Sequence, residues 1–96
     1  MQTSFPKPLK YDTIEEGKIY EFNVSETTTP VEILSVIKGQ VFNKNSTFLS
    51  FKLKDLLTQK EFQVGIEESL LDDLDEQIQK YIFKFYPIGT FLKELI

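Results

Sequence analysis

This sequence contains no cysteine, no histidine, no arginine and no tryptophan. Without cysteine the chain has no disulfide, no thiolate nucleophile and no Cys-based zinc site. Without histidine it lacks the usual general base at neutral pH and the commonest metal ligand. Without arginine it lacks bidentate recognition of phosphate or guanine. Since a phosphate-cradling glycine loop and a nucleophile elbow are also missing, we predict a non-enzymatic protein that needs no cofactor and no metal.

Long apolar runs are also missing. No stretch approaches the roughly 18–20 apolar residues that span a bilayer, and residues 1–10 lack the apolar core of a signal peptide. The sequence therefore predicts a cytoplasmic protein without membrane contact. Its length of 96 residues, with 41% hydrophobic and 27% charged side chains, suits one globular domain. We expect an extended N-terminal arm at 1–10, which contains Pro6 and Pro8, and a single domain at 11–96.

The charge that is present is distributed unevenly. The formal net charge is −4, yet residues 38–60 contain five lysines and a single carboxylate, Asp55. Three phenylalanines lie in the same stretch. The parts of the chain on either side are acidic, so the sequence predicts a dipolar molecule with one basic, aromatic segment.

Alternation of apolar and polar residues predicts a mainly β protein. Polar loops are expected at 25–30 and 43–47, and Gly39 is expected to form a bulge or bend. The predicted strands cover residues 18–24, 31–42, 48–55, 60–66 and 81–86, followed by a strand or short helix at 90–96.

One helix is predicted, at residues 69–80. Ser69 suits the N-cap and Asp72 stands at the third helical position, as in a capping box with Asp in place of Glu. The acidic run of this helix lacks the alternating spacing and central glycine of an EF-hand loop, so we expect a solvated face and not a metal site. The apolar stripe of the helix consists of Leu70, Leu71, Leu74, Ile78 and Ile82, and the acidic run of Asp72, Asp73, Asp75 and Glu76.

The hydrophobic pattern also predicts how the strands pair. If Asp55 faces Lys60 across a four-residue loop, the apolar residues of both strands share one face. The pairs are then Leu49–Ile66, Phe51–Val64 and Leu53–Phe62, with Lys54 opposite Glu61 on the other face.

A second predicted pairing, of Phe42 with Phe48, sets Val41 opposite Leu49. The same register sets Ile37 opposite Leu53. The outer face of the meander would then display Lys38, Gln40, Phe42, Phe48, Ser50, Lys52 and Lys54.

The predicted order of three strands, a helix and two strands resembles the OB-fold, a five-stranded Greek-key barrel with its helix between strands three and four. In this mapping strand one is 31–42, with 18–24 as its leading half. The alternatives are an SH3-like barrel or another small α+β fold. The resemblance implies binding of oligonucleotides or oligosaccharides on strands two and three, which is where the lysines and phenylalanines gather.

The resemblance therefore implies a module that binds single-stranded DNA or RNA with little sequence preference. Phe42 and Phe48 would stack on bases, and Lys38, Lys44, Lys52, Lys54 and Lys60 would follow the phosphates. The structural alternative is that the lysines only protect an exposed strand against edge-to-edge aggregation. A further alternative is a protein-interaction or assembly module, of viral or phage type, that uses the Phe42/Phe48 face or the loop residues Leu56 and Leu57. The sequence leaves the oligomeric state open, a homodimer included.

Overall fold

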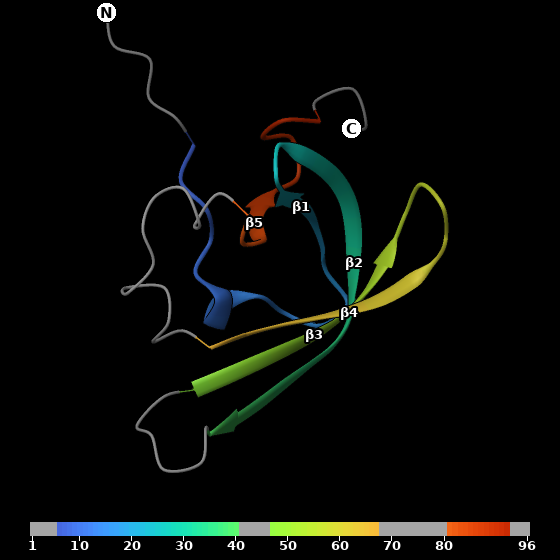
Figure 1. The fold of residues 1–96 in the computed structure, drawn as a ribbon. Helices are drawn as coiled ribbons and strands as arrows, with labels where there is room; N and C mark the ends of the chain where they lie inside the picture. The colour runs from blue at the N-terminus through green and yellow to red at the C-terminus, as the bar shows by residue number, and fades with distance from the viewer. Residues whose placement is uncertain (1–5, 41–46, 68–80, 93–96) are drawn as a thin grey trace, which may run out of the picture.

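The structure is an antiparallel β-sheet of five strands (Figure 1). It is a computed structural model, and it describes residues 6–40, 47–67 and 81–92. A short 3-10 helix, η1, precedes the sheet at Tyr11–Thr13. The strands are β1 (Ile19–Val24), β2 (Thr27–Gln40), β3 (Thr47–Asp55), β4 (Glu61–Glu67) and β5 (Lys84–Pro87).

The strand order is β4-β3-β2-β1-β5. The first four strands form a meander, and β5 returns to lie antiparallel to β1. A last strand that returns by a long connection to lie beside the first is the pattern of a Greek key. The prediction of a mainly β domain is therefore confirmed. The predicted mapping of 18–24 and 31–42 onto one strand is wrong, because β1 and β2 are separate strands that pair with each other. The helix predicted at 69–80 lies outside the described residues.

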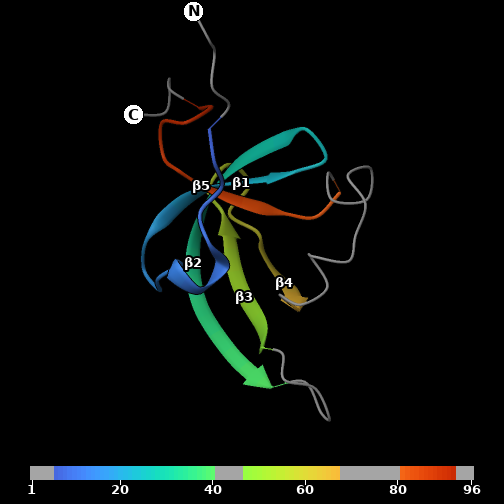
Figure 2. The same cartoon turned by 90° about the vertical axis from the view of Figure 1, so that its left-hand side faces the viewer.

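The strand β2 belongs to both halves of the sheet. Its first residues pair with β1, and from Val31 onward it pairs with β3. The register between β2 and β3 shifts between Ile33 and Ser35, so that Leu34 is an extra residue of a bulge. A bulge increases the local bend and twist of a strand, and Figures 1 and 2 show β2 curving from the β1/β5 half to the β3/β4 half.

Proline is tolerated inside β2 because of the direction in which its backbone groups point. The carbonyl of Pro30 accepts a hydrogen bond from the Leu56 N–H at 3.0 Å. The nitrogen of the same residue points to the same side of the strand, away from β1, so its missing N–H costs no bond of the β1–β2 ladder. The expected polar loop at 25–30 is therefore wrong for 27–30, which are part of the strand.

The core fills the angle between the two halves of the sheet and is rich in phenylalanine. Phe22 of β1 contacts Phe62 of β4 edge to face, with ring centroids 5.4 Å apart. Phe51 of β3 and Phe85 of β5 make a similar contact at 5.1 Å, and both are fully buried. Edge-to-face pairs at these distances are favourable beyond the area they bury. The aromatic contacts therefore hold the β3/β4 half against the β1/β5 half.

The predicted β3–β4 hairpin is confirmed in register and in facing. The three apolar pairs and the Lys54–Glu61 pair all occur as predicted. The Asp55 N–H donates to the Lys60 carbonyl at 2.8 Å across the four-residue loop. Phe51 is fully buried, whereas Lys52 and Gln63 are exposed. This hairpin positions every outward-facing side chain of β3 and β4.

The predicted β2–β3 register is wrong by three residues. Ile37 pairs with Ser50, and Val36 takes the inner position opposite Phe51. An odd shift moves each side chain of a strand to the opposite face, so Ile37 lies on the outer face, where it is 59% exposed. The bulge lies at Leu34 and not at Gly39, which pairs regularly with Phe48.

The two ends of the described chain both pack onto the sheet. In the predicted N-terminal arm, the Leu9 N–H donates to the Phe85 carbonyl at 2.8 Å, along the outer edge of β5. The Tyr11 hydroxyl donates to the Phe83 carbonyl. At the other end, Thr90–Leu92 are not a strand or a helix, so the element predicted at 90–96 is wrong for its described part.

Candidate functional site

The lysines of the outer face lie beside carboxylates from neighbouring strands. Lys52 Nζ lies 3.5 Å from a carboxylate oxygen of Glu61. Lys54 has Glu61 as its partner on β4 and Glu32 as its partner on β2. With Glu67 at the far end of β4, the described part of this face holds two lysines among three carboxylates. Its local charge is therefore close to neutral, which does not favour the binding of phosphates.

Among the described residues, Lys38 and Lys60 were also predicted to bind phosphates, and they do not join Lys52 and Lys54 on one track. Lys38 pairs with Leu49 and so lies on the opposite face of the sheet, at its exposed end. Lys60 closes the β3–β4 turn. Phe42 and Lys44 lie outside the described residues.

Phe48, the other predicted stacking residue, is 42% exposed. Its ring lies over Gly65 of the neighbouring strand, where an added Cβ would come within 2.5 Å of the ring tip. The tip of the ring therefore lies against β4 at Gly65.

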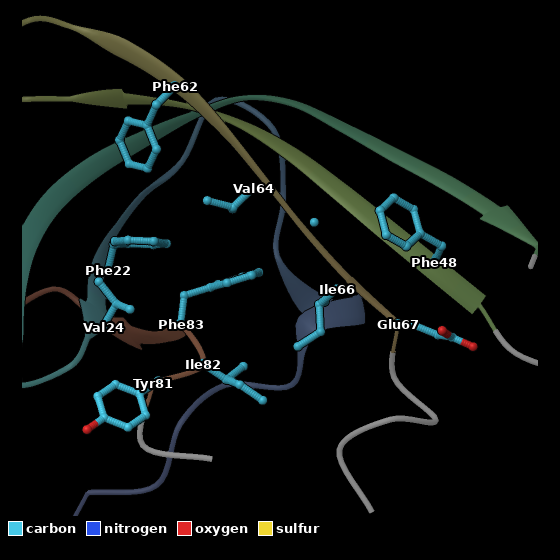
Figure 3. A pocket seen from close by; sticks show the side chains of 11 residues that line it. Phe22, Val24, Phe48, Phe62, Val64, Ile66, Glu67, Tyr81, Ile82 and Phe83 are labelled. Atoms are coloured by element: carbon cyan, nitrogen blue, oxygen red, sulfur yellow. The ribbon is translucent and has the colours of Figure 1, made fainter. Parts of the chain in front are cut away.

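An apolar groove of about 640 Å³ opens between β4 and the chain that leads into β5 (Figure 3). Figure 3 shows Val64, Ile66 and Phe83 pointing toward it, with Phe62 and Phe22 at its inner end. Glu67 and Tyr81, which border residues 68–80 in the sequence, both line this groove. Because the groove adjoins chain that lies outside the described residues, we assign no ligand to it.

A second apolar depression lies between β1, β2, the β3–β4 turn and the turn that follows β5. It measures about 360 Å³ and is lined by Ile19, Pro30, Leu56, Leu57 and Ile88. We call it the notch. Leu57 is 65% exposed and Ile19 is 48% exposed. Two large aliphatic side chains of the notch are therefore exposed to solvent.

The turn that presents Leu57 is held by hydrogen bonds. The Asp55 carboxylate accepts from the N–H groups of Leu57 and Thr58, at 2.8 and 3.2 Å. The Gln59 N–H donates to the Asp55 carbonyl, and Gln59 has a positive φ of 66°. The Leu56 N–H is bound to Pro30 of β2. Both the backbone and the side chain of Asp55 therefore anchor the backbone of the turn that presents Leu57.

A buried carboxylate lies next to the notch. Glu21 of β1 is fully buried. It accepts hydrogen bonds from the N–H groups of Gly89, Phe91 and Leu92 at 2.7, 2.7 and 3.2 Å. Phe91 also packs edge to face on Tyr86, with ring centroids 4.8 Å apart. Burial raises the pKa of the Tyr86 hydroxyl above its ordinary value.

Some residues in and beside the notch could be recognised from the sequence, and others could not. Leu56 and Leu57 stood out as unusual residues for a hairpin loop, which is the signal that marks the notch. Ile19 and Ile88 gave no signal of their own. Glu21 occupied an outward position in an alternating strand, where a solvated side chain is the ordinary expectation.

Comparison with protein-family models, with curated proteins and with solved structures gave no match. Within the described ranges 6–40, 47–67 and 81–92, no helix is long and apolar enough to cross a membrane. In the same part of the chain, no group of three or more carboxylates is placed to hold a metal ion. The acidic run at 72–76 lies outside it.

Proposed function

We propose that this protein is a non-enzymatic protein-interaction module that binds a short apolar segment of a partner protein in the notch. The observation that carries the proposal is Leu57, which is 65% exposed and held by the Asp55-anchored turn at the rim of an apolar depression. An exposed aliphatic side chain on a fixed turn is stabilised when a partner covers it.

The size of the notch favours a peptide segment over a large subunit. Stable protein–protein interfaces bury roughly 800 Å² on each partner. Among the described residues, five side chains line the notch around a volume of about 360 Å³. It fits one or two aliphatic or aromatic side chains of a partner, and such small interfaces are typical of weak, transient binding.

The charge of the outer β3/β4 face supports this choice over nucleic-acid binding. A single-stranded nucleic acid needs a positive track for its backbone, whereas Lys52 and Lys54 lie beside Glu61 and Glu32.

The type of barrel to which the sheet belongs is also a proposal. The order β4-β3-β2-β1-β5, with 19–24 as a strand of its own, suits the SH3-like barrel better than the OB-fold mapping.

The proposal is tested by selecting random dodecapeptides, displayed on phage, against the immobilised protein. We expect the recovered peptides to carry large apolar residues. We also expect their affinity to fall about tenfold or more for the Leu57→Ser variant, since burying a leucine side chain is worth about 1.5–3 kcal/mol. Leu57 is mostly exposed, so the variant should fold normally.

The matched control is Ile37→Ser, which removes an equally exposed aliphatic side chain from the outer face, away from the notch. This variant should bind the selected peptides as the wild type does. Peptides that bind both variants equally well, or that lose affinity only with Ile37→Ser, would contradict the notch as the binding site. Self-association that Leu57→Ser abolishes would show that the notch binds a second copy and not a peptide, and would also contradict the proposal.

A second candidate function, binding of single-stranded nucleic acid, is favoured by one observation. Phe48 is 42% exposed, in the outward-facing row that includes Ser50 and Lys52. Fluorescence anisotropy with labelled oligothymidylate and oligoadenylate tests it. If the candidate is right, affinity falls with salt at a log–log slope of about −0.7 per neutralised phosphate, and Phe48→Ala weakens binding without changing that slope. Absence of binding at about 50 mM salt would dismiss it.

A further inference from the structure

We propose that Glu21 is a positioning residue for the notch, because its buried carboxylate holds residues 89–92 against β1 and thereby fixes Ile88 as one wall. This inference rests on the proposed function of the notch. The residues that form this clasp are Glu21, Gly89, Phe91 and Leu92, all of them described.

The buried carboxylate of Glu21 uses both of its oxygens to bind the segment. A buried charge is costly unless hydrogen bonds satisfy its oxygens. Both oxygens of Glu21 are used: Oε1 accepts from Phe91, and Oε2 accepts from Gly89 and Leu92. Hydrogen bonds to an ionised acceptor are roughly twice as strong as neutral ones. The three backbone donors therefore fix the path of the segment, whatever its side chains are.

The clasp begins directly after the notch residue Ile88. Pro87–Thr90 form a turn in which the Thr90 N–H donates to the Pro87 carbonyl at 3.2 Å. Gly89 has a φ of 95°, which a glycine adopts without strain. The Gly89 N–H that binds Glu21 belongs to the peptide unit that follows Ile88. Holding this N–H therefore also sets the position of the Ile88 backbone.

The other contacts of the segment are fewer. Thr90 Oγ1 donates back to the Pro87 carbonyl, within the turn itself. Phe91 packs on Tyr86 but remains 45% exposed. Within the described part of the chain, the Glu21 carboxylate therefore joins 89–92 to the sheet by hydrogen bonds, and Tyr86 joins them by an apolar contact. Loss of the carboxylate should release the segment and leave the phenylalanine core intact.

Amide hydrogen exchange tests the clasp without any partner. In the wild type, the amides of Gly89, Phe91 and Leu92 should be protected. In Glu21→Gln, an N–H group of the new amide faces a backbone donor, so exchange at these three amides should accelerate about tenfold or more, while β3 amides keep their protection. The matched control Glu26→Gln changes an exposed carboxylate on the β1–β2 turn and should alter none of them.

Unprotected amides at 89, 91 and 92 in the wild type would overturn the clasp, even if Glu21→Gln does not fold. Equal protection in Glu21→Gln and wild type would overturn it as well. A second variant, Phe91→Ala, keeps all three backbone donors and should leave the amides of Gly89 and Leu92 protected. Loss of protection at both amides would mean that the Phe91 ring holds the segment, and would overturn the role of the carboxylate.

Binding of the selected dodecapeptides then tests the positioning role. We expect Glu21→Gln to weaken them and Glu26→Gln to leave them unchanged. If exchange accelerates at 89–92 while peptide affinity stays at the wild-type value, the positioning role is overturned and the notch stands. If Leu57→Ser has no effect on affinity, the notch itself fails, and the positioning role fails with it.

Discussion

The ring of Phe48 lies on Gly65, a glycine of the neighbouring strand that is offset diagonally from it. A glycine within a strand has no side chain to pack and weakens the sheet. A cross-strand aromatic ring that covers such a glycine compensates for part of this loss. Phe48 therefore has a structural role in the sheet, although the sequence suggested it as a stacking residue.

The first prediction concerns this pair. Gly65→Ala should destabilise the protein by about 1 kcal/mol, because the new Cβ displaces the ring of Phe48. In a Phe48→Ala background the same change should cost nothing or be slightly stabilising, since alanine suits a strand better than glycine. Urea unfolding of the two single variants and the double variant measures the coupling. An equal cost in both backgrounds would mean that the ring and the glycine do not interact.

The second prediction concerns the core. Phe51 is fully buried and contacts Phe83 and Phe85. Phe51→Ala should reduce the free energy of unfolding by about 3–5 kcal/mol, which is enough to unfold a small domain of ordinary stability. The neighbouring change Lys52→Ala should stay within about 0.5 kcal/mol, because its ion pair with Glu61 is exposed. Thermal unfolding of both variants separates the inner from the outer face.

The third prediction concerns the turn that carries Leu57. Asp55→Ala removes the acceptor of two backbone N–H groups and should cost about 1 kcal/mol of stability. Asp55→Asn keeps a side-chain oxygen and should retain most of this stability. If the proposed function is right, Asp55→Ala should also weaken the selected peptides more than Asp55→Asn does. Equal affinities of the two variants would contradict the role of the anchored turn.

The fourth prediction concerns alkaline pH. Burial raises the pKa of Tyr86 above 10.0, so in the folded state this group keeps its proton at a pH where the unfolded chain loses it. The contribution of Tyr86 to the free energy of unfolding is fully present below pH 10.0. It is lost as the pH rises through the pKa of the folded state, since the unfolded state then binds fewer protons than the folded state. Stability should therefore fall as the pH rises above about 10. Tyr86→Phe, which cannot ionise, should show a smaller fall, and an identical fall would contradict the assignment.

The β3–β4 hairpin could be predicted from the sequence because every signal agreed. Leu49, Phe51 and Leu53 alternate with polar residues, and only one register aligns them with the apolar residues of β4. The β2–β3 register could not be predicted in the same way. It depends on a bulge at Leu34, and a leucine inside an apolar run gives no local sign of a bulge.

The candidate site could be predicted only in part, because its character depends on distant residues. The outward direction of Lys52 and Lys54 follows from alternation within β3. The carboxylates that lie beside them come from other strands, and this removes the basic face that the sequence suggested. Glu21 is buried by residues about 70 positions away, which no local pattern predicts.

The most direct test of the central claim is a methyl-resolved NMR titration of the wild-type protein with a selected dodecapeptide. We expect the largest shifts at the methyl groups of Ile19, Leu56, Leu57 and Ile88, while those of Ile37 on the outer face stay unchanged. Shifts confined to Val64 and Ile66 of the groove, or to Ile37, would contradict the notch as the binding surface.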